Sequence, residues 1–267
     1  MEAPSRSQLR PVEDFYDDPF VEWTLRSAGT HLHPGREVAT VHLIERAQRF
    51  GFPTGKVVLD VASALGGPAR VVAKHFVATV ICLDMNPLMQ HGCQVLARNE
   101  GLDLRCQPVL ARSEVVPLAD HSMDAAWSQD AMCHMDKEAV VTEVARVLKP
   151  GSIFAFTDWI ARRPLGQEDK ERLGRLWGFP SLLQAVEYVA LLDACGFDLL
   201  LAEDRTPILT ARPFVPAFDQ DLFVYEFGDR WGQDEVDRQQ EPGEAWQEMV
   251  EAGTAGYGMF IARRHED

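Results

Sequence analysis

The sequence contains a pattern that could bind a nucleoside. Residues 60–67 (DVASALGG) follow a short apolar run and carry little side-chain bulk, so a ligand can approach their backbone closely. Asp84 lies 24 residues after Asp60, where its carboxylate could accept hydrogen bonds from both hydroxyls of a ribose. The alternative to a nucleoside site, for the turn taken alone, is a structural role, because α/β proteins in general have small residues in the first turn and an aspartate at a strand end.

The usual phosphate-binding patterns do not accompany this turn. A GxGxxG run, typical of NAD-dependent oxidoreductases, does not occur, because Ala62 and Ala64 stand at the first two glycine positions. A GxxxxGK[ST] run does not occur either. The pattern favours an adenosyl ligand without a pyrophosphate. An NAD-dependent oxidoreductase is the alternative, and a gain in thermal stability with NADH would reveal it.

A second group of polar residues follows the apolar run at residues 123–128. Gln129, Asp130 and His134 come after this run, so a strand ending there would bring them to one edge of a sheet. A histidine titrates near neutral pH and can accept a proton in that range. The alternative for His134 is a partly buried histidine that packs against or caps a loop.

Other reactive residue types occur in less specific patterns. His31 and His33 alternate and could suggest a metal, but no carboxylate or cysteine has the matching ligand spacing, so we expect a loop role and no metal. Cys133 is adjacent to His134 in the sequence. Neighbouring residues usually point apart, which disfavours a thiol nucleophile.

The elements that position these residues alternate between strands and helices. Apolar, β-branched runs predict seven strands, at residues 56–61, 79–84, 104–110, 123–128, 152–158, 197–204 and 257–263. Helices are predicted after Pro68, after Pro87, and over residues 136–148 and 181–195. This alternation predicts an α/β protein with a doubly wound, mostly parallel seven-stranded sheet.

Two stretches break the alternation and are predicted to be irregular inserts. One is the charged stretch between Trp159 and Pro180, and the other runs from Thr206 to about Glu244. Ligands of open α/β sheets bind at the carboxyl ends of the strands, so both inserts are candidate lids over that edge. Their aromatic residues could line a pocket for a methylated cation or form the inserts' own small core: Trp177, Phe179, Phe214, Phe218, Phe223, Tyr225, Phe227 and Trp231.

The composition excludes several classes of partner. The 267 residues include 41 Asp and Glu against 26 Lys and Arg, a net charge of −15 that disfavours nucleic acid and anionic membrane surfaces. The apolar stretch at residues 181–202 is interrupted by acidic residues, so no membrane span is predicted. Five cysteines without CxxC spacing, and a start without an apolar h-region, favour a cytoplasmic protein with free thiols.

Several motifs resemble those of class I S-adenosylmethionine-dependent methyltransferases. They are DVASALGGPAR, Asp84 after TVICLD, MDAAWSQDAMCHM and ARVLKPGSIFAFTDW. More closely, FYDDPF, HLHPG, WSQDAMCHM and the terminal EAGTAGYGMFIARR resemble the sarcosine/dimethylglycine and phosphoethanolamine N-methyltransferases. The resemblance extends over nearly the whole chain and implies a Rossmann-like methyltransferase fold with lid inserts.

The resemblance implies S-adenosylmethionine as cofactor and a small molecule as methyl acceptor. It implies His134 as proton acceptor or acceptor-orienting group, paired with Tyr16, and Asp130 and His134 as acceptor contacts. It also implies that the residues around His33 lie against the methionine part of the cofactor. The cofactor residues are then Asp60, Ala62, Ser63, Ala64, Gly66, Asp84, Met85, Ser113, Glu114 and Gln129.

Two features depart from the family's pattern. Ala62 and Ala64 stand where the family usually has glycine, and an extra methyl group could crowd the cofactor or stiffen the loop. Arg112 stands where many relatives have an acidic residue that bonds the adenine amino group. Adenine recognition is therefore expected to use backbone groups.

We expect N-terminal lid helices over residues 1–50 and a methyltransferase domain over residues 51–267, with inserts at about 160–180 and 206–244. The expected reaction is methyl transfer to an amine by in-line displacement, for example to a sarcosine-, dimethylglycine- or phosphoethanolamine-like acceptor. O-, S- or C-methylation of a small metabolite and a non-catalytic binding module are the alternatives, because a fold does not determine a function. The expected assembly is a monomer or homodimer.

Overall fold

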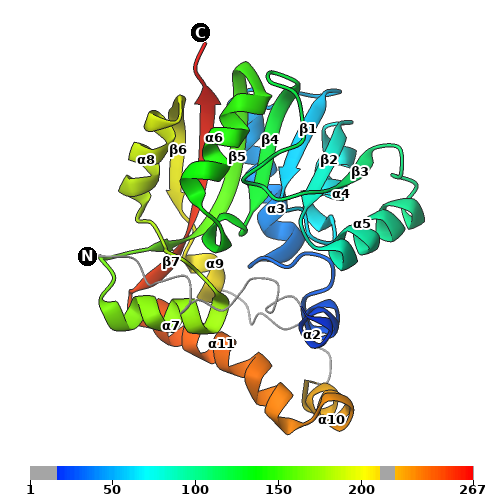
Figure 1. Ribbon diagram of the computed structural model, residues 1–267, viewed down its shortest axis with the longest axis vertical. Helices are drawn as coiled ribbons and strands as arrows, with labels where there is room; N and C mark the ends of the chain where they lie inside the picture. Colours follow the sequence, from blue (N-terminus) through cyan, green and yellow to red (C-terminus); the bar gives the residue numbers. More distant parts are fainter. Residues whose placement is uncertain (1–16, 211–219, 267) are drawn as a thin grey trace.

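Residues 17–210 and 220–266 are described in a computed structural model of the chain. One sheet runs through them in the strand order β3-β2-β1-β4-β5-β7-β6, and only β7 is antiparallel to its neighbours (Figure 1). The predicted doubly wound, mostly parallel seven-stranded sheet is confirmed. The strands are β1 (Val57–Val61), β2 (Thr79–Asp84), β3 (Cys106–Leu110), β4 (Met123–Gln129), β5 (Leu148–Ala161), β6 (Phe197–Asp204) and β7 (Ala255–Arg264).

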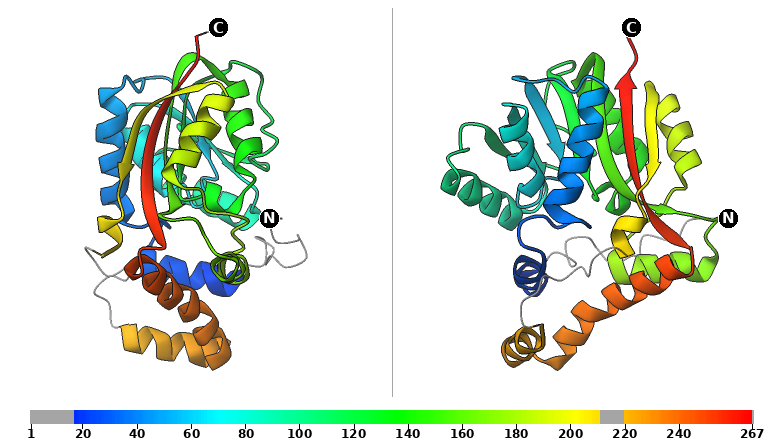
Figure 2. Two further views of the ribbon diagram at one scale, coloured as in Figure 1. Left: turned by 90° about the vertical axis from the view of Figure 1, so that its left-hand side faces the viewer. Right: turned by 180° about the vertical axis from the view of Figure 1, so that it is seen from behind.

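Helices cover both faces of the sheet. One face carries α3 (Arg36–Arg49), α4 (Gly67–His75) and α5 (Pro87–Asn99), and the other carries α6 (Lys137–Val147) and α8 (Ala185–Ala194) (Figure 2). Local sequence sets where these helices begin. The side chain of Asn86 accepts hydrogen bonds from the N–H groups of Leu88 and Met89, and Asp136 caps α6 in the same way.

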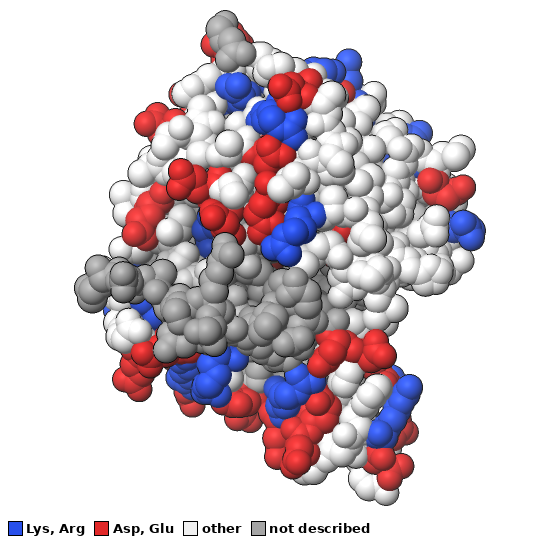
Figure 3. All heavy atoms as spheres, in the orientation of Figure 1, with Lys and Arg blue, Asp and Glu red and all other residues white. Residues whose placement is uncertain are grey.

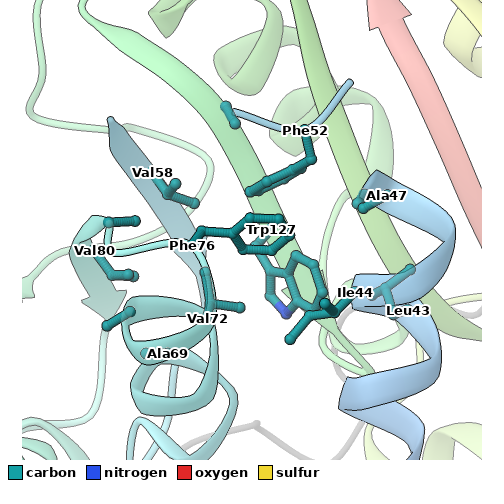
Figure 4. Packing of buried hydrophobic residues seen from close by; sticks show 14 of the residues in the cluster. Leu43, Ile44, Ala47, Phe52, Val58, Ala69, Val72, Phe76, Val80 and Trp127 are labelled. Carbon is teal, nitrogen blue, oxygen red and sulfur yellow. The ribbon is translucent and has the colours of Figure 1, made fainter. Parts of the chain in front are cut away.

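The core under α3 and α4 fixes the strand that leads to the candidate site. Trp127 of β4 is fully buried, and its ring lies edge-on to Phe52 at 5.7 Å between centroids (Figure 4). Its indole N–H donates to the side-chain oxygen of Gln129 at 3.2 Å. Burial of a side chain this large stabilises the fold by about 1.5–3 kcal/mol, and the same packing orients a residue at the strand's end.

The two inserts are helical, so the prediction that they are irregular is wrong for the residues described. The first contains α7 (Gln167–Trp177). Most of its residues are charged, but Leu173, Leu176 and Trp177 form a buried stripe along one side of the helix. The second contains α9 (Pro207–Thr210), α10 (Gln220–Trp231) and α11 (Gln233–Glu251), and α11 continues through Pro242. Apolar residues three and four apart are the helical signal that the charge and proline content obscured.

The insert helices lie beyond the carboxyl ends of the parallel strands. Figures 1 and 2 show α7, α10 and α11 there together with α2 (Asp18–Ala28). Acidic and basic side chains alternate around α7 and α11 (Figure 3), and the ion pairs Arg172–Glu248 and Arg175–Glu241 join these two helices. The inserts therefore occupy the side of the sheet where a ligand is expected.

Some predicted boundaries move by a few residues. Helix α8 begins at Ala185 rather than at residue 181, and β5 begins at Leu148, which directly follows α6. The apolar stretch at residues 181–202 is divided between α8 and β6. Within the described ranges, no helix is both long enough and apolar enough to span a membrane.

Candidate active site

A pocket opens at the carboxyl ends of β1, β2 and β4. The predicted site residues that line it are Asp60, Ala62, Ser63, Ala64, Asp84, Met85, Ser113, Glu114, Gln129, Asp130 and His134. Gly66 is not among the lining residues, and it begins α4 as the N-cap. Tyr16 lies outside the described residues.

The backbone of the first turn explains why glycine is usual at two of its positions. Ala62 and Ala64 have φ angles of +54° and +46°, in the left-handed region that side chains with a Cβ rarely adopt. The turn is closed by the N–H of Ser63, which donates to the carbonyl of Leu83 at 2.8 Å, and by that of Gly66, which donates to the carbonyl of Ser63 at 2.8 Å. The alanines therefore preserve the conformation that glycine adopts freely.

Asp84 connects the first turn to the second strand. Its Oδ2 accepts from the N–H of Ala64 at 2.8 Å, and its Oδ1 accepts from the N–H of Asn86 at 2.9 Å. Burial raises the pKa of Asp84, and these backbone hydrogen bonds oppose the rise. A carboxylate has about four acceptor positions, so acceptor capacity remains that could receive a ribose hydroxyl.

Four buried polar atoms of the pocket lack a hydrogen-bond partner among the residues that the structure describes. They are Oδ2 of Asp60, Oγ of Ser63, Nε2 of Gln129 and Oδ2 of Asp130. Burial also raises the pKa of Asp60 well above its ordinary value, with smaller contributions from Cys93 and Asp84. Buried polar groups are normally hydrogen-bonded, so these atoms fit a polar, partly cationic ligand such as S-adenosylmethionine.

Gln129 is oriented by a chain of hydrogen bonds that starts in the N-terminal segment. Nε2 of His33 lies 2.9 Å from the carbonyl of Arg36 and 3.1 Å from Oγ1 of Thr40, whose hydroxyl donates to Oε1 of Gln129 at 2.9 Å. Together with the indole of Trp127, this fixes the amide oxygen on the protein side. Burial, then the neighbouring His31, lowers the pKa of His33 to about 3, so its imidazole is uncharged at neutral pH.

Asp130 directly follows β4 and lines the pocket together with Gln129. Its φ is +58°, and its Oδ1 accepts from the hydroxyl of Thr157 at 2.9 Å. The hydroxyl of Tyr257 donates to Oγ1 of Thr157, also at 2.9 Å. Oδ2 of Asp130 is buried with no partner in the described part of the chain. Burial raises the pKa of this carboxyl well above its usual range, and hydrogen bonds from Tyr257 and Thr157 oppose the rise only in part.

His134 ends the short helix η2 (Met132–His134), next to Asp130. Its ring packs edge-to-face on Phe179 at 4.7 Å between centroids and hydrogen-bonds the backbone of Trp177. Burial, reinforced by the positive charge of Lys137, lowers the pKa of His134 to about 3. The imidazole is therefore neutral at physiological pH and can orient an acceptor more readily than it can store a proton.

The other candidates from the sequence have different positions. Cys133 is fully buried, and burial raises the pKa of its thiol well above the ordinary value. Of the described insert aromatics, Trp177, Phe179, Phe223 and Phe227 pack in two small cores, and Tyr225 is 74% exposed. Phe214 and Phe218 lie outside the described residues. In the described ranges, no three His, Cys, Asp or Glu side chains converge on a metal position.

The segment that covers the pocket, its roof, includes two lining residues that were not predicted from the sequence, Thr30 and Leu32. Thr30 and Leu32 line the pocket together with His33, from the segment between α2 and α3. A Cβ on Gly67 would lie 2.1 Å from the carbonyl oxygen of Thr30, so the segment contacts the first turn directly. No local signal marks Thr30 and Leu32, because tertiary packing alone brings them there. Arg112, Pro68 and Met89 also line the pocket.

Comparison with known proteins places the chain in a family. A methyltransferase-domain family model matches residues 59–156. Methyltransferase GfsG of Streptomyces halstedii is 31% identical over 226 residues, which cover 80% of this chain and 76% of that protein. 24-Methylenesterol C-methyltransferase 2 of Arabidopsis thaliana is 29% identical over 199 residues, 72% of this chain and 53% of that protein, so the chain spans about half of that relative's length.

Solved structures share the fold. A putative sarcosine dimethylglycine methyltransferase from Galdieria sulphuraria superposes with a TM-score of 0.83 at 20% identity, covering 95% of this chain and 99% of that chain. A further neighbour, from Haemonchus contortus, was solved in complex with S-adenosyl-L-methionine. The sequence relatives, the shared fold and the polar pocket after β1 and β2 agree, and the chain belongs to the class I S-adenosylmethionine-dependent methyltransferases.

Proposed function

We propose that this methyltransferase methylates the nitrogen of a small amine held between Asp130 and His134. The observation that carries the proposal is Oδ2 of Asp130, which is buried at the pocket with no partner in the described ranges. A buried carboxylate oxygen is costly unless a donor or a cation meets it. The N–H group of a neutral amine supplies the donor, and the ammonium that methyl transfer forms supplies the cation.

The charge of the pocket supports an amine rather than an anionic acceptor. Asp60, Asp84 and Asp130 line it, and Arg112 is the one Lys or Arg among the described lining residues. The Arg112 side chain lies 3.5 Å from the carboxylate of Glu114, on the side of Asp84 and Met85. A phosphoethanolamine-like acceptor therefore has no described cation at the Asp130 end, which favours an acceptor whose recognised group is the amine itself.

The chain's residues supply alignment and electrostatics. Bound S-adenosylmethionine supplies an electrophilic methyl group that a nitrogen lone pair can attack in line. A positive charge beside Asp130 favours its ionised form against the effect of burial, and the carboxylate would in turn stabilise the charge that the nitrogen acquires during transfer. The neutral His134 would accept a hydrogen bond from the acceptor and aim its lone pair. With a pKa of about 3, His134 acts here as an orienting group, and the acceptor enters already deprotonated.

Labelled methyl transfer into a panel of small amines, thiols, phenols, carboxylates and sterols tests this function. We expect transfer to amines, with kcat/KM lowered about 100-fold or more in Asp130→Asn and His134→Ala and S-adenosylhomocysteine affinity nearly unchanged. Asp193→Asn, on the exposed side of α8, is the matched control. Transfer only to carbon, oxygen or sulfur would contradict the amine. Equal loss of turnover and cofactor affinity in His134→Ala would make that residue structural.

A further inference from the structure

A buried polar cluster lies behind His134 and is not used by the proposed chemistry. It consists of Lys137, Asp158 and Tyr188, which are 5%, 0% and 0% exposed. They come from α6, β5 and α8, and none of them lines the pocket. Well-packed apolar residues of similar size often stabilise a core as well as a buried ion pair or better, so stability alone does not account for this cluster.

Asp158 fixes the backbone that carries His134. Its Oδ1 accepts from the N–H of Cys133, the residue before His134, at 3.1 Å. Its Oδ2 accepts from the hydroxyl of Tyr188. The carboxylate thus connects η2 to α8, and the hydroxyl of Tyr188 holds the carboxylate in place.

Lys137 fixes the segment that packs on the imidazole. Its Nζ donates to the carbonyl of Ser181 at 2.8 Å. Ser181 lies two residues after Phe179, whose ring contacts the imidazole of His134. Trp177, at the end of α7, hydrogen-bonds the same imidazole through its backbone. Lys137 therefore connects the start of α6 to the segment that follows α7.

We propose that Lys137, Asp158 and Tyr188 are positioning residues that hold the His134 imidazole in its orientation toward the acceptor. The inference rests on the proposed role of His134. One contact fixes the peptide before His134, and the other fixes the segment whose ring packs against it. The positive charge of Lys137 also favours the neutral imidazole.

Tyr188→Phe and Lys137→Met test the proposal with matched controls. Tyr225→Phe removes a hydroxyl from a tyrosine that is 74% exposed, and Lys56→Met removes an exposed ammonium. We expect both test variants to lower kcat at least roughly 10-fold, because small displacements of a catalytic group are costly. KM and S-adenosylhomocysteine affinity should change less than about twofold, and the controls should match the parent chain. Unchanged kcat in folded Tyr188→Phe would overturn the proposal, whether or not Lys137→Met folds.

The imidazole can also be observed without turnover. In the S-adenosylhomocysteine complex, we expect the ring resonances of His134 to shift and broaden in Tyr188→Phe and to stay unchanged in Tyr225→Phe. In Lys137→Met, the His134 titration should move to higher pH, since one positive charge is lost. Lys137 is the charged neighbour that acts on His134. The other titratable groups on the packed elements are Asp130, Cys133, Asp158 and Tyr188.

These spectra separate the two proposals. If no amine is methylated, altered His134 signals in Tyr188→Phe would still support the positioning role while the amine proposal fails. If amine methylation depends on His134 and its signals are the same in Tyr188→Phe and Tyr225→Phe, the positioning role is wrong.

Discussion

At the scale of single residues, Ala62 and Ala64 hold a conformation that costs a residue with a Cβ roughly 1–2 kcal/mol. Glycine removes this cost but loses about 0.4–1 kcal/mol more on ordering. We therefore expect the double variant Ala62→Gly, Ala64→Gly to unfold with a free energy about 1 kcal/mol higher than the parent, measured by urea denaturation. Ala202→Gly, exposed in β6 with an ordinary backbone, should instead lower it.

The same variants show what the two methyl groups do in the pocket. S-adenosylhomocysteine affinity that stays the same would mean that the alanines only stiffen the turn. A large gain in affinity would mark them as impaired contacts. A loss of stability in the double variant would contradict the strain inferred from the φ angles.

The residues that could be predicted share one property. Asp60, Asp84 and Asp130 directly follow or end runs that read as buried strands, so the topology alone brings them to one edge. His134 could be singled out by its motif. Its low pKa could not be predicted, because it depends on burial under Phe179 and on Lys137, which only the folded chain brings together.

At the scale of elements, the segment between α2 and α3 is fastened to the first turn. The guanidinium of Arg70 is 4% exposed and donates to the carbonyl of Leu65 at 2.7 Å and to the hydroxyl of Thr30 at 2.8 Å. Gly67 allows the backbone of Thr30 to approach. The position of the segment that covers the pocket therefore depends on Gly67 and Arg70, both in α4.

Gly67→Ala should displace this roof. Its Cβ would lie 2.1 Å from the carbonyl oxygen of Thr30, so we expect a stability loss of about 1–3 kcal/mol and weaker S-adenosylhomocysteine binding by calorimetry. Gly243→Ala is the matched control, because its Cβ would meet nothing within 4 Å in α11. That control should be stabilising by up to about 1 kcal/mol. Unaltered cofactor affinity in folded Gly67→Ala would show that the roof does not contribute to binding.

Strands and sheet-covering helices could be predicted because their apolar periodicity is strong. The inserts could not, although Leu173, Leu176 and Trp177 carry a helical period. Charged residues surround that stripe, and Pro242 lies within α11 where a proline normally indicates a break. The positions of α7 and α11 also depend on contacts distant in sequence, such as Arg172–Glu248.

At the scale of the whole molecule, the free energy of unfolding depends on pH through several buried groups. Acidification raises the contribution of some of these groups and lowers that of others. Burial raises the pKa of Asp60, Asp130 and Asp158, so the folded chain binds protons at these sites more readily than the unfolded chain. These groups add stability as the pH falls. Burial lowers the pKa of His33 and His134 to about 3, so the unfolded chain binds protons there first, and these two groups remove stability below about pH 6.5.

A comparison between variants isolates one histidine from the carboxyl groups. With a folded pKa of about 3 against about 6.5 unfolded, His33 should cost about 2 kcal/mol more at pH 5 than at pH 7. His33→Gln removes this cost, so the variant should gain about that much stability relative to the parent on acidification, measured by urea denaturation at both pH values. His91→Gln, on the exposed side of α5, controls for the loss of an imidazole. If the stabilities of the parent and both variants change with pH in parallel, His33 is protonated in the folded protein at pH 5. The hydrogen bonds from a neutral His33 through Thr40 to Gln129 would then not be what orients Gln129 in the pocket.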